Sequence, residues 1–151
     1  MSNFVYTPAK QKLAKGDLDF DVADLRVKLV MTDTTADTEQ DAANLTAITT
    51  LDEYDGSGYA EIDLANVAVN QDDPNNRSEI DYDNDNFGTA VAAGTRQAQA
   101  ALYYVRVDGT PGNDYPVAYV DTVSTGPTFP FDGNGGQINW NIDAEGALQV
   151  A

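Results

Sequence analysis

The chain contains neither cysteine nor histidine. Without cysteine there is no disulfide framework, thiolate nucleophile or cysteine-ligated zinc, and without histidine there is no imidazole base or Ser-His-Asp triad. Basic residues are also scarce, because 8 Lys and Arg stand against 25 Asp and Glu and give a net charge of −17 at pH 7. Such a charge repels phosphate backbones and anionic lipid, so we expect no binding to nucleic acid or to a membrane surface.

Long hydrophobic runs are missing too. The longest apolar stretches, at residues 27–31 and 98–105, are too short or too interrupted to cross a bilayer. Residues 1–8 lack the basic segment and the apolar block of a secretory signal, so we expect no signal peptide. A length of 151 residues favours a single domain with a substantial hydrophobic core.

Aspartate is what the chain has in abundance. It contains 20 Asp and 5 Glu, together with 12 Asn, 12 Gly and 14 Thr. Asp and Asn side chains hydrogen-bond to the nearby main chain and thereby favour turns over helices. This composition, with turn signals about every 8–15 residues, predicts one all-β domain. We expect a β-sandwich or barrel-like fold of about seven to eight short strands with a short N-terminal helix.

Residue periodicity places the individual elements. Pro8 near the start, Lys15 in the last turn and Gly16 just beyond it predict a helix of about two turns. Residues 17–21 alternate strictly. Residues 25–31 alternate again, with Leu25, Val27, Leu29 and Met31 on one face, and form the clearest strand. Further strands are predicted at residues 59–64, 67–69, 96–107, 115–123, 137–142 and 147–150, with a hairpin loop at residues 108–114.

Two segments depart from the strand pattern. Residues 38–48 favour a second short helix, and residues 71–86 are almost wholly polar and predict a long exposed excursion. The single tryptophan, Trp140, alternates with Ile138 and Ile142, which favours a place on the hydrophobic face over a role as a ligand platform. No internal repeat or linker indicates a second domain.

The densest acidic motif is formed by Asp81, Asp83 and Asp85, which occupy alternate positions of the predicted excursion. Calcium loops use this spacing because alternate residues of a tight turn point toward the ion. The sharp-turn position, however, holds Asn86 instead of Gly, and Ala92 stands where a bidentate Glu would complete the ligand set. A solvated acidic loop is therefore the preferred interpretation, and a calcium site is the alternative.

The acidic residues also raise the question of carboxylate-based hydrolysis. Glycoside hydrolases need two carboxyl groups with different pKa values on either side of a sugar. With 25 acidic residues such pairs occur by chance, and no aromatic platform accompanies them. We therefore expect no enzymatic activity.

Charge is distributed unevenly along the chain. Residues 1–16 form a basic N-terminal arm of charge +3, carried by Lys10, Lys12 and Lys15, whereas residues 17–151 form an acidic β domain of charge −20. A short basic element on an acidic body is suited either to fold back onto that body or to reach an acidic surface on a partner. We expect the second arrangement, with the three lysines as partner-binding residues.

The order of several short motifs resembles that of small virion structural proteins of tailed bacteriophages, over most of the chain. The motifs are KGDLD at 15–19, DLRVKLV at 24–30, GY at 58–59, AALY at 100–103, PVAYVD at 116–121, GGQINWN at 135–141 and GAL at 146–148. None of them is a catalytic signature. The acidic segment at residues 71–86 is longer and more polar than this pattern.

The resemblance implies a non-enzymatic decoration protein on the capsid exterior, made in the host cytoplasm, that cements and stabilises the shell. Its expected partners are the major capsid protein and copies of itself, as in a homotrimer, because many weak contacts repeated by symmetry give avidity. Two alternatives stay open: a tail or adsorption component, and a calcium-dependent module that binds a host receptor or glycan through residues 81–85.

Overall fold

The computed structural model describes residues 3–141 and 148–150. Most regular elements are strands of antiparallel sheets, and the described part contains one α-helix, near the N-terminus. The prediction of an all-β fold with a short N-terminal helix is therefore confirmed, whereas closure into a sandwich or barrel stays a prediction. The elements are β1 (Phe4–Val5), α1 (Thr7–Lys15), β2 (Leu25–Met31), β3 (Ile62–Asp63), β4 (Ala68–Asp72), β5 (Arg77–Asp81), β6 (Asp85–Asn86), β7 (Ala98–Val105), β8 (Tyr115–Val120), β9 (Asn139–Trp140) and β10 (Leu148–Val150), with 3-10 turns at Leu45–Ala47 and Asp73–Asn75.

A five-stranded sheet with the order β1-β8-β7-β2-β3 forms the centre of the molecule. Its longest pairing joins β2 to β7, from Leu25 opposite Val105 to Met31 opposite Ala98, with a register shift at Val30. All six residues of β8 are buried, as are seven of the eight in β7. Burial of consecutive residues means that both faces of these strands are covered, unlike a strand with one solvated face.

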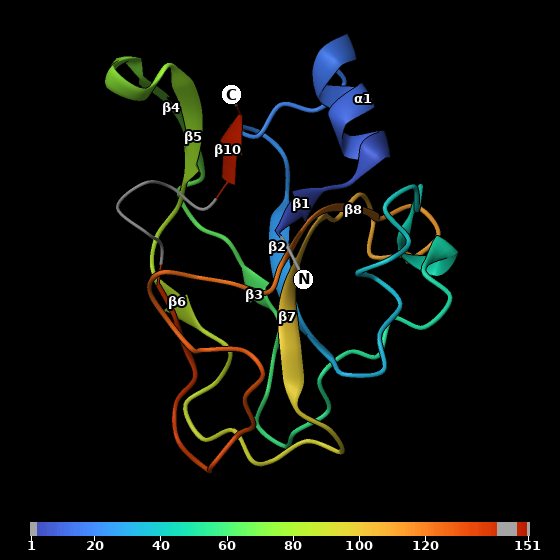
Figure 1. Cartoon of the computed structure of the whole chain (residues 1–151), viewed down its shortest axis with the longest axis vertical. Helices are drawn as coiled ribbons and strands as arrows, with labels where there is room; N and C mark the ends of the chain where they lie inside the picture. The colour runs from blue at the N-terminus through green and yellow to red at the C-terminus, as the bar shows by residue number, and fades with distance from the viewer. Residues whose placement is uncertain (1–2, 142–147, 151) are drawn as a thin grey trace.

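Helix α1 sits at one end of the central sheet (Figure 1). It is preceded by β1, which pairs with β8 through Phe4 and Tyr119, and it ends at Gly16, whose N–H donates to the Leu13 carbonyl at 3.1 Å. Gly16 has φ +76°, a conformation that glycine adopts without a Cβ penalty. Because only Ala9 of the helix is buried, most of α1 is left at the surface.

Residues 17–21 do not form the expected strand. Leu18 and Phe20 are buried, but the chain turns here, with the Asp21 N–H donating to the Asp19 carboxylate at 3.1 Å. The expected helix at residues 38–48 is likewise wrong, since this segment folds into turns and one 3-10 turn capped by the side chain of Asn44. In both places, Asp and Asn side chains bond the nearby backbone in place of a regular element.

The polar segment at residues 71–86 is not one exposed excursion. Much of it belongs to a hairpin in which β4 pairs with β5, and β10 pairs with the other edge of β5. Ile80 in β5 is buried, whereas Asn76 at the tip takes a left-handed conformation with φ +53°. The apolar residue within the polar run therefore marks a strand packed on the core.

Trp140 is buried, as predicted. Its indole N–H lies 2.9 Å from the Tyr82 hydroxyl and 3.1 Å from the Tyr103 hydroxyl, to which it donates. Burial raises the pKa of Tyr82 to about 12. This buried cluster joins the β6-β9 pair to the central sheet, while Ile142, predicted to share the face of Trp140, lies outside the described residues.

Candidate partner-binding surface

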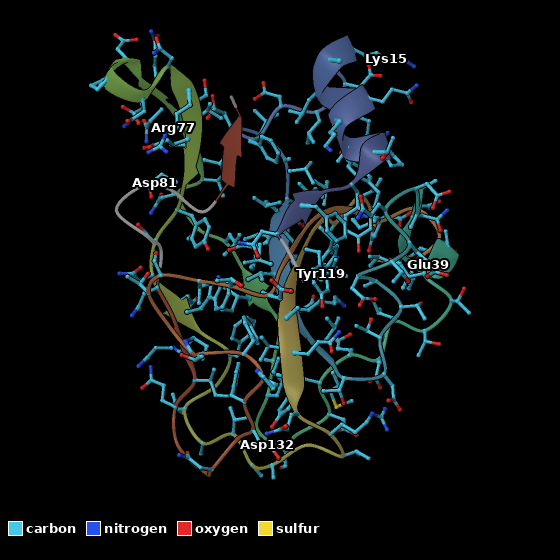
Figure 2. All side chains as sticks on the ribbon, in the orientation of Figure 1. Lys15, Glu39, Arg77, Asp81, Tyr119 and Asp132 are labelled. Atoms are coloured by element: carbon cyan, nitrogen blue, oxygen red, sulfur yellow. The ribbon has the colours of Figure 1, made fainter. Side chains whose placement is uncertain are left out.

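The three lysines of α1 differ in their surroundings. Lys10 and Lys15 are exposed, and Lys15 lies at the upper end of the molecule in Figure 2. Lys12 is half-buried, with its Nζ 4.6 Å from the centroid of the Tyr115 ring, a cation-π contact. None of these lysines forms an ion pair with an acidic residue within residues 3–141 and 148–150, so the contact of the helix charge with the acidic domain is that of Lys12 with Tyr115.

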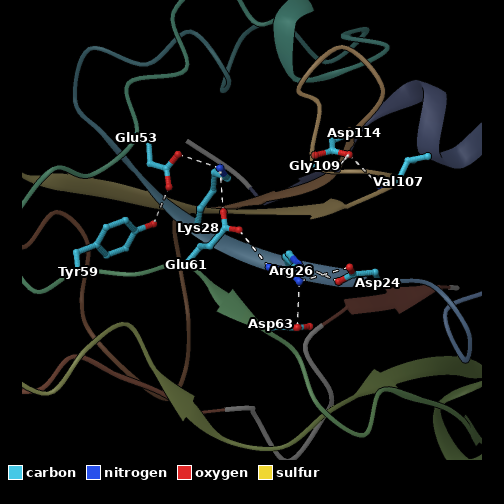
Figure 3. Close-up of polar contacts among 10 residues, drawn as sticks. All are labelled: Asp24, Arg26, Lys28, Glu53, Tyr59, Glu61, Asp63, Val107, Gly109 and Asp114. Atoms are coloured by element: carbon cyan, nitrogen blue, oxygen red, sulfur yellow. Dashed lines mark hydrogen bonds and ion pairs between the residues drawn. The ribbon is translucent and has the colours of Figure 1, made fainter.

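Three arginines, in contrast, are neutralised internally. The Arg26 guanidinium on β2 pairs with Asp24 at 2.9 Å and with Asp63 at 3.0 Å (Figure 3). Two others are paired as follows: Arg77 with Asp72 and Glu79, and Arg96 with Asp52 and Asp33. Their charge is balanced within the chain and is not left for a partner.

Lys28 is also neutralised, although its side chain is only 9% exposed. Its Nζ lies 2.9 Å from Glu53 and 3.1 Å from Glu61, and 4.8 Å from the centroid of the Tyr104 ring. Burial opposes ionisation of Glu61, but the hydrogen bond from Tyr104 and the charge of Lys28 outweigh it and lower its pKa. A buried ammonium needs partners of this kind.

One further cation resembles the lysines of α1. Arg106 is exposed at the end of β7 and is in no ion pair of the described part, but its charge acts on Asp108, whose pKa is lowered by hydrogen bonds from Thr110 and Asn113 and then by Arg106. Its main-chain N–H donates to the Asp24 carbonyl at 2.9 Å, which joins the β7-β8 loop to the turn before β2. Arg106 does not stand out in the sequence, because a single arginine in an acidic segment is expected to pair with a nearby acidic residue.

Three large apolar side chains are exposed on segments that hydrogen bonds connect to Arg106 and to each other. The large hydrophobic residues that are exposed in the described part are Val22 (81%), Val107 (60%) and Val69 (43%). The Val69 N–H donates to the Asp21 carboxylate at 3.0 Å, so the turn that carries Val22 touches β4. Single exposed valines are ordinary, but these three lie on segments that hydrogen bonds join to one another.

Asp114 fixes the loop that carries Val107. Its buried carboxylate accepts from the N–H groups of Val107 (2.7 Å), Asp108 (3.3 Å) and Gly109 (3.3 Å), as Figure 3 shows in part. The next residue, Tyr115, carries the ring under Lys12. The loop and the helix are therefore connected. We call this surface the attachment face and define it by Lys10, Lys12, Lys15, Arg106, Val22, Val69 and Val107.

The acidic motif does not assemble into a cation site. Asp81 accepts from the N–H of the next residue, and Asp83 accepts from the Asn66 amide at 2.6 Å. Asp85, in β6, accepts from the main chain of Asn86 at 2.8 Å. Within the described residues, no three acidic side chains are grouped so that they could hold a metal ion. The motif therefore supports no calcium proposal.

Comparison of the chain with protein-family models, with curated proteins and with solved structures gives no match. Among the described residues, no helix has the length and apolar character that spanning a bilayer requires. Function is therefore inferred from the chemistry of the attachment face.

Proposed function

We propose that the chain is a non-enzymatic virion structural protein of a tailed bacteriophage, bound to the outside of the capsid shell as a decoration protein that stabilises it. One observation carries the proposal: the cations without an ion pair in the described part are the three lysines of α1 and Arg106, on segments whose contacts connect them with those of the exposed valines, while the remaining cations are neutralised. The order of sequence motifs supports the same class of protein.

The partner surface implied by this face is acidic, with apolar patches between the carboxylates. A body with a net charge of −20 beyond residue 16 is repelled by such a surface except through the basic helix α1, so the charge distribution orients the molecule as it approaches. Burial of the exposed valines on contact adds hydrophobic affinity that does not depend on charge. We assign this partner as the major capsid protein, with neighbouring copies of the chain completing a symmetric ring such as a homotrimer.

Modest contacts suffice for this role. A shell presents many identical sites, and a decoration protein that contacts the shell and its own neighbours gains avidity from each repeat. Repulsion between acidic bodies keeps free copies apart in solution until the basic ends face the shell. Binding would then crosslink adjacent shell subunits and raise the temperature at which the particle opens.

The proposal is tested by binding the purified chain to particles stripped of it, at about 50 mM and about 300 mM salt, where the Debye length falls from roughly 14 to 6 Å. The variant with Lys10, Lys12 and Lys15 changed together to Gln is expected to bind about tenfold more weakly at the lower salt concentration. Its affinity should also depend less on salt than that of the wild type.

A matched control variant distinguishes an effect of the attachment face on binding from an effect of net charge. Changing Gln137→Glu, Asn139→Asp and Asn141→Asp together alters net charge by the same three units at exposed positions outside the attachment face. This control should bind shells almost as tightly as the wild type. Equal weakening of both triple variants would contradict an attachment face, and a cryo-electron-microscopy map that places the chain on the tail, or nowhere on the particle, would contradict the decoration role.

A further inference from the structure

A surface groove lies at the other end of the molecule. Its volume is about 520 Å³, and segments 126–128, 131–134 and 137–141 line it. This volume falls in the range of roughly 300–1,000 Å³ that is typical of small-ligand sites. In Figure 2, Asp132 in the groove lining is labelled at the lower end of the molecule, and Lys15 of the attachment face at the upper end. A chain attached through its basic end would therefore leave this groove accessible.

A row of amide side chains lines one wall of the groove. Gln137, Asn139 and Asn141 are exposed, whereas Ile138 and Trp140 between them are buried. Alternation along an extended segment places the three amides on the same side, about 7 Å apart from one to the next. No hydrogen bond occupies these side-chain amides in the part of the chain that the structure describes. Each amide therefore offers both donors and an acceptor to a ligand.

Segment 131–134 of the lining is held in place by hydrogen bonds of its main chain. Phe131 exchanges two of them with Ala98, at 2.8 and 2.9 Å, and the Gly133 N–H donates to the Tyr54 hydroxyl at 2.8 Å. A Cβ atom at Gly133 would lie 2.3 Å from the Ala92 carbonyl oxygen, so only glycine fits this close approach. A rigid wall reduces the entropy that a ligand loses when it binds.

The charge of the lining restricts the ligand. The described lining contains no Lys or Arg, and its one acidic residue, Asp132, already accepts from the Tyr54 hydroxyl (2.6 Å) and from the Gly94 N–H (2.9 Å). An anionic ligand would find no counter-charge here. Phe131 and Pro127 add apolar surface beside the amides. The groove therefore suits a neutral molecule that combines many hydroxyl groups with apolar C–H faces.

We propose that this groove binds a neutral oligosaccharide, with Gln137, Asn139 and Asn141 hydrogen-bonding to sugar hydroxyls and Phe131 packing against a ring face. A peptide strand fits the groove less well. Strand β9 is two residues long, and the Asn141 carbonyl already accepts from the Thr125 hydroxyl at 3.4 Å, which shortens the backbone edge available for pairing. The proposal concerns the free chain and does not depend on attachment to a shell.

The test follows the side-chain amide signals in ¹⁵N–¹H NMR spectra while neutral hexasaccharides of glucose, mannose and N-acetylglucosamine are added one at a time. At least one sugar should shift the Gln137, Asn139 and Asn141 signals in a saturable way. The absence of any saturable shift up to about 10 mM, a concentration that detects even millimolar affinity, would overturn the proposal. Saturable shifts caused only by an unstructured peptide would overturn it in favour of strand pairing.

Variants then locate the site. Asn139→Ala should weaken binding of the active sugar by about threefold to tenfold, the loss expected when one hydrogen bond to the ligand is removed. The matched control is Asn70→Ala, at an exposed strand amide of the β4-β5 hairpin outside the groove, and it should leave the affinity unchanged. Equal effects of the two variants would place the binding site elsewhere.

Discussion

Lys12 and Lys28 each lie over a tyrosine ring, at 4.6 and 4.8 Å from its centroid, but they belong to regions with opposite chemistry. Lys28 is buried on β2, with two glutamates in contact, whereas Lys12 lies on α1 without an acidic partner in the described part. An ammonium group must be neutralised where water cannot reach it, but it can stay unpaired at the surface. The cations of the two regions therefore have different surroundings: Arg26 and Lys28 in the central sheet pair with acidic residues, and the lysines of α1 form no ion pair in the described part.

The largest loss of stability is expected when Lys28 of the paired region is replaced. The same substitution at Lys10 of α1 provides the comparison. Lys28→Met leaves Glu53 and Glu61 without their shared cation and should lower the free energy of unfolding by about 2–3 kcal/mol. This figure is below the cost of breaking a fully buried pair because both glutamates are partly solvated. Lys10→Met should change stability by less than about 0.5 kcal/mol. Urea unfolding measures both, and similar losses would remove the distinction between the two regions.

A somewhat smaller loss is expected where the body supports the attachment face. Asp114→Ala removes the acceptor of three main-chain N–H groups in the loop that carries Val107 and should cost about 1–2 kcal/mol. Asp114→Asn keeps an acceptor oxygen and serves as the control. The alanine variant should also bind stripped particles more weakly because Val107 is no longer held in place. Full binding by a destabilised Asp114→Ala variant would exclude Val107 from the attachment face.

Lowering the pH should reduce the stability that Glu61 contributes to the paired region around Lys28. Burial opposes ionisation of Glu61, yet Tyr104 and Lys28 lower its pKa below the usual 4.5. A carboxyl group with a lowered pKa contributes stability above its unfolded value and loses that contribution as the pH falls through its folded value. The advantage of the wild type over Glu61→Gln, measured by thermal unfolding, should therefore be constant above about pH 5 and shrink below about pH 4.5. If the stability difference between the wild type and Glu61→Gln grew as the pH falls, the direction assigned to the Glu61 pKa shift would be wrong.

The smallest effect concerns the ring contact of α1. Lys12→Gln removes the cation over Tyr115 and should lower the free energy of unfolding by about 0.5 kcal/mol, as expected for an exposed cation-π contact. Lys10→Gln, with no such ring, is the matched control. Unfolding curves of the two variants, recorded at low salt, give the difference between their free energies of unfolding. If the two variants have the same stability, the ring contact contributes nothing and Lys12 belongs with Lys10 and Lys15.

Dense apolar runs placed β7 and β8 within longer predicted strands, and alternation placed β2 at residues 25–31 with both boundaries right. The same rule failed at residues 17–21. There the alternation is real in burial, with Leu18 and Phe20 inside, but the chain turns because Asp19 bonds the main chain of Asp21.

The sequence likewise identified only some residues of the attachment face. The three lysines stood out in the sequence, since residues 1–16 contain no acidic residue. Val22, Val107 and Arg106 did not, because one apolar or basic residue within a polar turn has no period to mark it. A valine within a polar turn is a usable signal, because an apolar residue in a turn is a candidate for a contact surface.

By itself, the sequence determined the charge of each segment, the absence of cysteine and histidine chemistry, and the strands whose alternation is strongest, because these depend on composition and on neighbours along the chain. Only the tertiary structure decided which cations are paired. Arg26 meets Asp63, 37 positions away, because β2 pairs with β3, and no local pattern specifies that register. The amide-lined groove was decided in the same way, since its walls come from separate segments that packing around Trp140 and the backbone bonds of Phe131 bring together.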